Sequence, residues 1–334
     1  MAGHGNVLTH FRGAAILAPW VLWLLLADTA ISLQLPLKWL APDFVYNSSS
    51  RIAETVWYWI QIIFERYNGA NITFSGDALP RGESAVVVAN HVGWADFYMI
   101  QALAIKAGML GRCRYFAKIQ LRIVPFLGWG LWAMGMPMVS RNWAKDKHEL
   151  DRAFSGIVNR QWPTWLISFS EATRFTQKKY EQSIVWCKES GRPQPMHLLY
   201  PRTKGFITTV QHLRKAPHVK AVYDVTIAYQ RGKDFHAAPT MWDTLSVPGL
   251  SSRLGYKFHV HVRRFPLETL PTDDEKLAKW LENLWLFDAV FTAKPGNRLG
   301  KAKIGNGMQS VTVNVTDKQV DHSIRRWKVP YKVG

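Results

Sequence analysis

The stretch that decides the fold is residues 86–96, which read VVVANHVGWAD. Residues 86–89 form a short apolar run, which is typical of a buried strand in an α/β sheet. Asn90 and His91 follow this run directly, and Asp96 comes five residues after the histidine. Since α/β folds place their sites just beyond the carboxyl ends of strands, this segment predicts a functional site at that edge of a sheet.

His91 and Asp96 together can form an acid/base unit. The carboxylate can hold one imidazole nitrogen in a fixed tautomer, which leaves the other nitrogen free to take a proton. This arrangement suits activation of a hydroxyl for attack on an activated acyl carbon. The alternative is structural, because His91 could be a satisfied core histidine and Asp96 could cap the helix expected after it. The pair alone leaves both interpretations open.

The composition narrows the class of partner. The chain has 334 residues, and 42 Lys and Arg against 24 Asp and Glu give a formal net charge of +18, which attracts nucleic acid, anionic lipid or a phosphorylated substrate. The 16 Trp and 11 Tyr favour a membrane interface, and the sequence carries no nucleic-acid-binding signature. Cys113 and Cys187 form neither a disulfide framework nor a metal site, which fits a reducing compartment such as the cytosol.

The amino-terminal region predicts a membrane anchor. Residues 14–33 are long enough to cross a bilayer core, although Pro19 and Asp28 interrupt them. Residues 56–64 are shorter and aromatic, which favours a position at the interface. We expect residues 1–67 to form a two-helix anchor hairpin and not a cleaved leader. A buried helical hairpin of a soluble protein is the alternative.

Strand and helix patterns alternate through residues 68–291. Strands are expected at residues 72–76, 86–89, 136–140, 165–169, 221–230 and 257–263, and helices at 97–107, 146–159, 204–213 and 273–291. This alternation predicts an α/β catalytic domain with a layered, mainly parallel sheet and flanking helices. Residues 292–334 are rich in Gly, Lys and Asn, and we expect a basic tail that is either solvated or laid on an anionic membrane.

Further polar groups follow the other predicted strands. Glu171 and Arg174 can bind a polar head, because the guanidinium clamps phosphate and the carboxylate accepts from hydroxyls. A structural ion pair between these two residues is the alternative. Arg141 is another cation after a short strand, and Arg202 and Lys204 flank the start of an expected helix.

Taken together, these groups resemble the motifs of the glycerophospholipid acyltransferase family, whose best-known members are the lysophosphatidic acid acyltransferases. Asn90 to Asp96 match the first motif of the family, and residues 171–174 resemble its third motif, Glu-Gly-Thr-Arg. The second block is matched by Lys118, Pro125, Gly128 and Arg141, and the fourth by Tyr200 and Pro201. Residues 201–206 and Trp280 with Leu281 are similar to the longer eukaryotic branch. The resemblance covers about residues 50–291, and it departs from the family at Ser170 and Ala172, where Pro and Gly are usual.

The resemblance implies an acyl-CoA-dependent lysophospholipid acyltransferase of the endoplasmic reticulum membrane, with its active site on the cytosolic face. His91, oriented by Asp96, would be the general base that deprotonates the free glycerol hydroxyl. The substrate-binding residues would be Asn90, Lys118, Arg141, Glu171, Thr173, Arg174, Pro201, Arg202 and Lys204. Lysophosphatidic acid is the expected acceptor and lysophosphatidylinositol the alternative. Acyl-CoA is expected as co-substrate, with no cofactor, no metal and no nucleic-acid partner.

Two functions of other classes stay open. A catalytically silent membrane protein that binds lipid head groups or scaffolds partners is motivated by the altered third motif and the basic tail. A basic nucleic-acid binder is suggested by the net charge, but the predicted anchor and the missing motifs speak against it.

Overall fold

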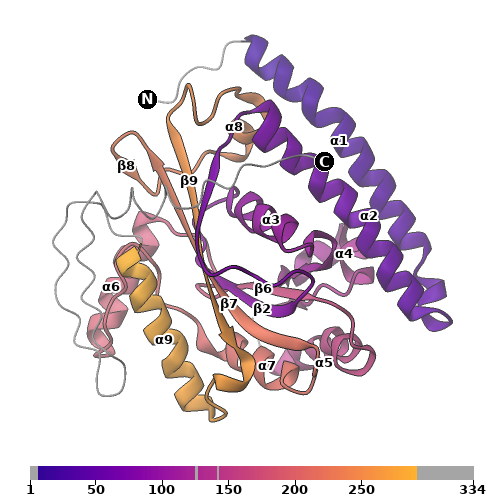
Figure 1. Ribbon diagram of the computed structural model, residues 1–334, viewed down its shortest axis with the longest axis vertical. Coiled ribbons are helices and arrows are strands. Elements are labelled where there is room, and N and C mark those ends of the chain that lie inside the picture. Colours follow the sequence, from indigo (N-terminus) through magenta and orange to yellow (C-terminus); the bar gives the residue numbers. More distant parts are fainter. Residues whose placement is uncertain (1–6, 125–126, 141–142, 292–334) are drawn as a thin grey trace.

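The computed structural model describes residues 7–124, 127–140 and 143–291. A twisted sheet runs through the molecule, with helices on both of its faces (Figure 1). The strand order is β1-β9-β7-β2-β6-β3, and β8 pairs with β7. The strands are β1 (Ile72–Gly76), β2 (Ser84–Ala89), β3 (Cys113–Tyr115), β6 (Trp165–Phe169), β7 (Val219–Arg231), β8 (Asp234–Phe235) and β9 (Tyr256–Pro266).

The sheet is mainly parallel, as the alternating pattern predicted. Strand β2 is parallel to both of its neighbours, β6 and β7, and β3 and β1 are parallel to β6 and β9. Only β7 with β9 and β7 with β8 pair antiparallel among the described strands. All six residues of β2 are buried, because helices cover both faces of this central strand.

Alternate residues of β2 face two separate hydrophobic cores. Val87 and Ala89 belong to the core under α3 (Asp96–Lys106), and Val86 and Val88 belong to the core on the opposite face. That second core is closed by α5 (Trp143–Arg160), α7 (Thr203–Leu213) and α9 (Asp274–Phe291). The two-layered packing follows from the period of two in a strand, which sends successive side chains to opposite faces.

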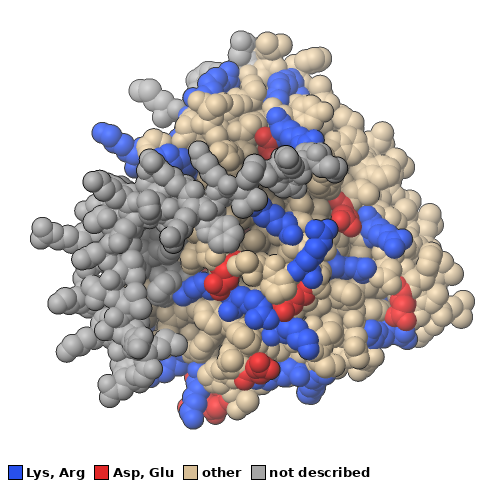
Figure 2. Space-filling model, in the orientation of Figure 1, with Lys and Arg blue, Asp and Glu red and all other residues tan. Residues whose placement is uncertain are grey.

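Two long helices, α1 (Val7–Leu33) and α2 (Pro42–Ile62), form a hairpin along one flank of the molecule (Figure 1). Helix α1 is the one described helix that is long and apolar enough to cross a membrane, by length and composition. It packs against α2, α4 (Leu127–Ala133) and α8 (Met241–Ser246), and it exposes Leu22, Leu25 and Leu26 on its other side. The corresponding edge of the space-filling view is largely free of charged side chains (Figure 2).

Helix α2 is longer than the stretch 56–64 suggested, and polar side chains connect it to the region around β3. The guanidinium of Arg114 is 1% exposed and donates to the Ser50 hydroxyl at 2.7 Å and to the carbonyls of Gly111, Cys113 and Met134. It also lies 4.8 Å from the ring centroid of Tyr46 in α2. Arg114 therefore joins α2 to β3 without an acidic partner among the described residues.

Several elements differ from the sequence-based expectations. The strand expected at 136–140 is reduced to β5 (Met138–Val139), which pairs with β4 (Ala117–Lys118) in a separate two-stranded sheet. Helices α4, α6 (Gln177–Glu189) and α8 were not expected, because their apolar residues do not form a clear periodic stripe. The basic tail, residues 292–334, lies outside the described residues, and the domain boundaries at 67 and 291 stay a prediction.

Candidate active site

Three of the predicted motifs meet at the carboxyl edge of the sheet. Strands β2 and β6 are neighbours, so the residues that follow them leave the sheet side by side. The Phe175 N–H donates to the His91 carbonyl at 2.7 Å, and the Arg202 N–H donates to the Ser170 carbonyl at 2.7 Å. These backbone bonds join the loops of the first, third and fourth motifs into one unit.

The imidazole of His91 and the carboxylate of Asp96 form a direct hydrogen bond, with 2.7 Å between Nδ1 and Oδ2. The same Oδ2 accepts from the N–H groups of Val92 at 2.7 Å and Gly93 at 3.0 Å. Oδ1 accepts from the Tyr229 hydroxyl at 2.7 Å. Asp96 is completely buried, so this shell of four donors fixes its orientation and that of the histidine.

The capping interpretation of Asp96 is wrong. The N-cap of α3 is Ala95, which makes no side-chain cap bond, and Asp96 is the first residue of the helix. The Asp96 carboxylate binds the turn that precedes the helix and the His91 ring, and no described backbone N–H of α3 donates to it. The aspartate is therefore an orienting group for the histidine.

The other side of His91 is left accessible. Its ring stacks on Phe169 with a centroid distance of 4.0 Å and an interplanar angle of 14°, and Phe97 meets Phe169 edge-on. The His91 side chain is 13% exposed, and its Nε2 makes no hydrogen bond with a described residue. A neutral imidazole with its proton on Nδ1 would thus present a free Nε2 lone pair, as a general base needs.

Asn90 holds the end of β2 against β7. Its side-chain amide donates to the Ile227 carbonyl at 2.9 Å, and its side-chain oxygen accepts from the Ile227 N–H at 2.7 Å. Asn90 is 3% exposed, and both ends of its amide bind backbone. The geometry therefore gives Asn90 a positioning role for the neighbouring His91, and contact with substrate stays a prediction.

Glu171 is the second buried carboxyl group at this edge. It is 3% exposed, and it faces the N–H groups of His91, Leu199 and Trp285, none of which reaches full hydrogen-bonding geometry. Burial, and then the negative charge of Asp96, raise the pKa of Glu171 well above its ordinary value. The protonated acid is therefore favoured at this position.

The rest of the third motif turns outward. Ala172 has a φ of +56°, in the left-handed region that favours glycine, which is the usual family residue here. The side chain of Arg174 is exposed and forms no ion pair with Glu171, so the structural ion pair is excluded. The Thr173 hydroxyl accepts from Lys179 Nζ at 2.5 Å, which also donates to the Arg174 carbonyl.

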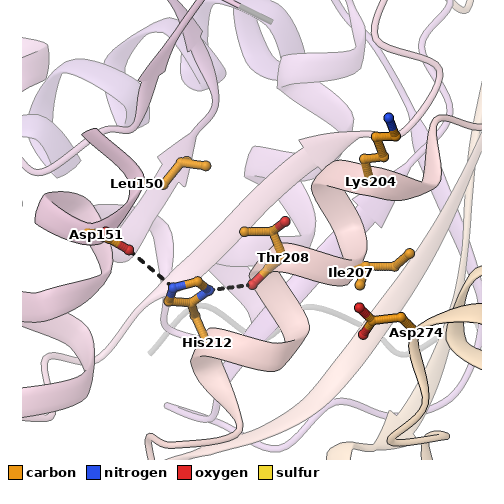
Figure 3. Close-up of a pocket in the computed structure, with 7 residues that line it drawn as sticks. All are labelled: Leu150, Asp151, Lys204, Ile207, Thr208, His212 and Asp274. Atoms are coloured by element: carbon orange, nitrogen blue, oxygen red, sulfur yellow. Dashed lines mark hydrogen bonds and ion pairs between the residues drawn. The ribbon is translucent and has the colours of Figure 1, made fainter. Parts of the chain in front are cut away.

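The remaining predicted cations are dispersed. Lys118 is exposed at the end of β4, Pro201 is buried, and Arg202 is exposed at the N-cap of α7. Arg141 lies outside the described residues, as does Pro125. Lys204 is exposed at the start of α7 and lines a hollow of about 380 Å³ between α5, α7 and α9 (Figure 3). Its other lining residues are Leu150, Asp151, Ile207, Thr208, His212 and Asp274.

Several residues of the site were not found from the sequence. Tyr229 lies in the predicted strand 221–230, but no local pattern shows that its hydroxyl binds Asp96. Phe169 belongs to a predicted strand, yet its stacking on His91 depends on the β2–β6 register. Lys179, Leu199 and Trp285 approach the third motif from other segments. These contacts form when the chain folds, and the sequence pattern alone does not predict them.

Known proteins are similar to this chain in sequence. Residues 71–230 match the family model described as Acyltransferase, and residues 252–286 match the one described as Acyltransferase C-terminus. The 1-acyl-sn-glycerol-3-phosphate acyltransferase delta of Homo sapiens is 33% identical over 232 residues, which cover 67% of this chain and 57% of that protein. The 1-acyl-sn-glycerol-3-phosphate acyltransferase 3 of Arabidopsis thaliana is 29% identical, over 71% of this chain and 61% of that protein. The chain thus spans about three fifths of the length of these relatives.

A solved structure shares the fold. The crystal structure of the 1-acyl-sn-glycerophosphate (LPA) acyltransferase PlsC from Thermotoga maritima aligns with a TM-score of 0.50 and 16% identity, over 87% of this chain and 98% of that chain. The region matched by the two family models contains His91, Asp96 and Glu171. On these grounds, the chain belongs to the acyltransferase family.

Proposed function

We propose that this protein is a membrane-bound acyltransferase that transfers the acyl group of acyl-CoA to the free glycerol hydroxyl of lysophosphatidic acid. The observation that carries the proposal is the buried Asp96 carboxylate on Nδ1 of His91, with Nε2 left unbonded among the described residues. The activities in the names of the relatives support the acceptor. Lysophosphatidylinositol is the alternative acceptor.

In this proposal His91 acts as the general base. Nε2 takes the proton from the acceptor hydroxyl as its oxygen attacks the thioester carbonyl, which forms the new C–O bond. The tetrahedral intermediate collapses with cleavage of the C–S bond, and the proton passes from His91 to the leaving thiolate. The products are the diacyl lipid and CoA. Asp96 holds the tautomer before the proton transfer and stabilises the imidazolium afterwards.

The acceptor phosphate would bind to cations at the carboxyl edge of the sheet. Arg174 and Arg202 are exposed next to the joined loops, and we assign them to phosphate binding. For Lys118, Lys204 and Arg141 the same role rests on the resemblance to the family alone. Glu171 as a protonated acid would donate a hydrogen bond to a substrate oxygen. More basic than acidic side chains lie on the face drawn in Figure 2, which favours anionic substrates.

The membrane assignment rests on α1, whose outward side is apolar and exposed. We propose that it holds the protein on the endoplasmic reticulum membrane with His91 facing the cytosol, where acyl-CoA is supplied. No cofactor enters the proposed reaction. Protein partners are left unassigned.

The test is an acyl-transfer assay on detergent-solubilised protein with labelled acyl-CoA and a panel of lysophospholipids. We expect transfer to lysophosphatidic acid, and a His91→Ala variant with the same thermal midpoint should lose about 10²–10⁴-fold in kcat. A product with lysophosphatidylinositol alone would select the alternative acceptor. No product with any acceptor would instead support a catalytically silent lipid-binding protein.

A further inference from the structure

Three cations surround the indole ring of Trp132 in α4. Lys38 Nζ lies 5.1 Å from a ring centroid, and the guanidinium carbons of Arg122 and Arg152 lie 5.4 and 4.8 Å away. A cation within about 6 Å of an indole face is attracted by the ring, but like charges gathered on one ring repel each other. Lys38, Arg122, Trp132 and Arg152 are called the Trp132 cluster below.

The positive charge of the Trp132 cluster is only partly neutralised. Arg152 donates to Glu149 at 2.9 and 2.5 Å. Lys38 and Arg122 form no ion pair with a described residue, and Lys38 donates only to the Ala133 carbonyl at 3.5 Å. Burial, and then the charge of Arg152, lower the pKa of Lys38 to about 8. The charge of Glu149 also acts on Lys38, whereas Arg122 has no ion-pair partner among the described residues.

The indole N–H of Trp132 also lacks an acceptor in the part of the chain that the structure describes. Its Nε1 is buried and makes no hydrogen bond with a described residue. A buried donor without an acceptor costs about 1–3 kcal/mol. A negatively charged oxygen at the edge of the ring would accept from this N–H and neutralise Lys38 and Arg122 at the same time.

The surroundings of the Trp132 cluster are apolar and exposed. Leu35, Arg122, Trp129 and Trp132 line a depression of about 360 Å³. Exposed apolar side chains lie on or next to the same segments, η1 (Pro36–Trp39), η4 (Ile119–Ile123) and α4; they are Leu37, Trp39, Leu40, Ile123, Val124 and Trp129. Trp39 is 91% exposed and Ile123 is 81% exposed. Large apolar side chains in water beside cations fit a membrane surface better than a soluble anion.

We propose that the Trp132 cluster binds the phosphate headgroup of an anionic membrane phospholipid, whose acyl chains lie against Leu35 and Trp129. None of the residues of the Trp132 cluster belongs to the joined loops that carry His91, Glu171 and Arg202, although Arg122 follows Lys118 by four residues in the chain. This lipid site would fix the protein on anionic membranes at the turn of the α1–α2 hairpin, close along the chain to Lys118 in the catalytic domain.

The test is flotation of the full-length protein with phosphatidylcholine vesicles, with and without 20% phosphatidic acid. Wild type is expected to bind the anionic vesicles at least about 25-fold more tightly, since each of the two unpaired charges should contribute about fivefold. A Lys38→Gln/Arg122→Gln variant should lose about 5-fold in this preference for each charge removed, and its binding to pure phosphatidylcholine should not change. The matched control, Lys233→Gln/Lys276→Gln, removes the same charge from exposed positions elsewhere and should change the preference less than twofold. Equal losses in the two double variants would overturn the proposal.

A Trp132→Phe variant keeps an aromatic ring and all charges, but it replaces the indole with a smaller phenyl ring that has no N–H donor. It should bind anionic vesicles several-fold less tightly than wild type, so it keeps the proposal testable if the double variant fails to fold. If this variant binds with wild-type affinity, the indole N–H of Trp132 does not donate to the lipid phosphate, and that part of the proposal is wrong. Inorganic phosphate at constant ionic strength should not displace the protein from the vesicles. Displacement would identify a site for a soluble anion and overturn the assignment to a lipid.

Discussion

Asp96 and Glu171 are two buried carboxyl groups at the same edge of the sheet, with opposite hydrogen-bond environments. Asp96 is 0% exposed and accepts from four donors, whereas Glu171 is 3% exposed and no described residue donates to it at full hydrogen-bonding geometry. Burial, and then the charge of Asp96, raise the pKa of Glu171 well above its ordinary value, whereas the four donors hold the Asp96 carboxylate in one orientation. The Asp96 carboxylate therefore orients His91, whereas Glu171 is an acid whose oxygens have unfilled hydrogen-bonding capacity.

The comparison is tested most severely by Asp96→Asn. The variant keeps the shape of the side chain but removes the charge that orients the His91 tautomer, so kcat should fall by about 10³–10⁴-fold. The acyl-transfer rate at saturating substrate measures this loss, with circular dichroism as the control for folding. A loss below tenfold in a folded variant would mean that Asp96 has no special role compared with Glu171.

Tyr229→Phe removes one of the four donors to Asp96. Burial, and then the charge of Asp96, raise the pKa of Tyr229 well above its ordinary value, so its hydroxyl is a constant donor. We expect a loss of about tenfold in kcat and about 1–3 kcal/mol of stability, because one oxygen of Asp96 is then left unpaired. Chemical denaturation and kinetics on the same preparation measure both effects. An unchanged kcat would show that the other three donors, which bind Oδ2 of Asp96, are enough to orient the carboxylate.

Glu171→Gln tests whether the second buried carboxyl group is protonated. The folded pKa of Glu171 is raised above 4.5, so the folded state holds a proton that the unfolded state releases. Wild-type stability therefore falls as the pH rises from about 4.5 to the folded pKa, by at most about 1.4 kcal/mol per pH unit. The variant lacks this decline, so its thermal midpoint relative to wild type should increase between pH 5 and pH 8.

A parallel response of the two proteins across this range would place an ionised carboxylate at position 171. On the kinetic side, we expect Glu171→Gln to raise the acceptor KM several-fold with little change in kcat, since the amide can still donate but lacks the geometry of the acid.

The smallest expected effect concerns the residue beside Glu171. Ala172 has a φ of +56°, which costs a residue with a side chain about 1 kcal/mol. Ala172→Gly should therefore stabilise the protein by up to about 1 kcal/mol, with kcat within twofold of wild type. Denaturant midpoints measure the gain. A destabilised variant would mean that the alanine methyl group contributes packing that outweighs its strain.

The sequence was sufficient to predict the parts of this site that are local. The apolar run before Asn90 predicted the central strand β2. The spacing of His91 and Asp96 left a hydrogen-bonded pair and a helix cap open, and the family resemblance favoured the pair that the structure contains. The mainly parallel sheet also followed, because strands and helices alternate along the chain.

The parts that were missed depend on register between distant strands. Tyr229 reaches Asp96, and Ile227 holds Asn90, only because β7 lies next to β2. Glu171 is an isolated acid and not part of an ion pair because its side chain is buried while that of Arg174 is exposed. Neither quantity has a signature within a short segment.

The buried guanidinium of Arg114 limits where this chain can be cut. The guanidinium donates four hydrogen bonds, and one of its acceptors, the Ser50 hydroxyl, belongs to the amino-terminal hairpin. The Tyr46 ring beside it belongs to the same hairpin. A protein that began at residue 68 would leave this cation without its hydroxyl acceptor and its aromatic cover, and a buried charge that loses its partners costs several kcal/mol. Removal of the hairpin to obtain a soluble enzyme would therefore unfold the region around β3, and solubility is better sought by replacing the exposed leucines of α1.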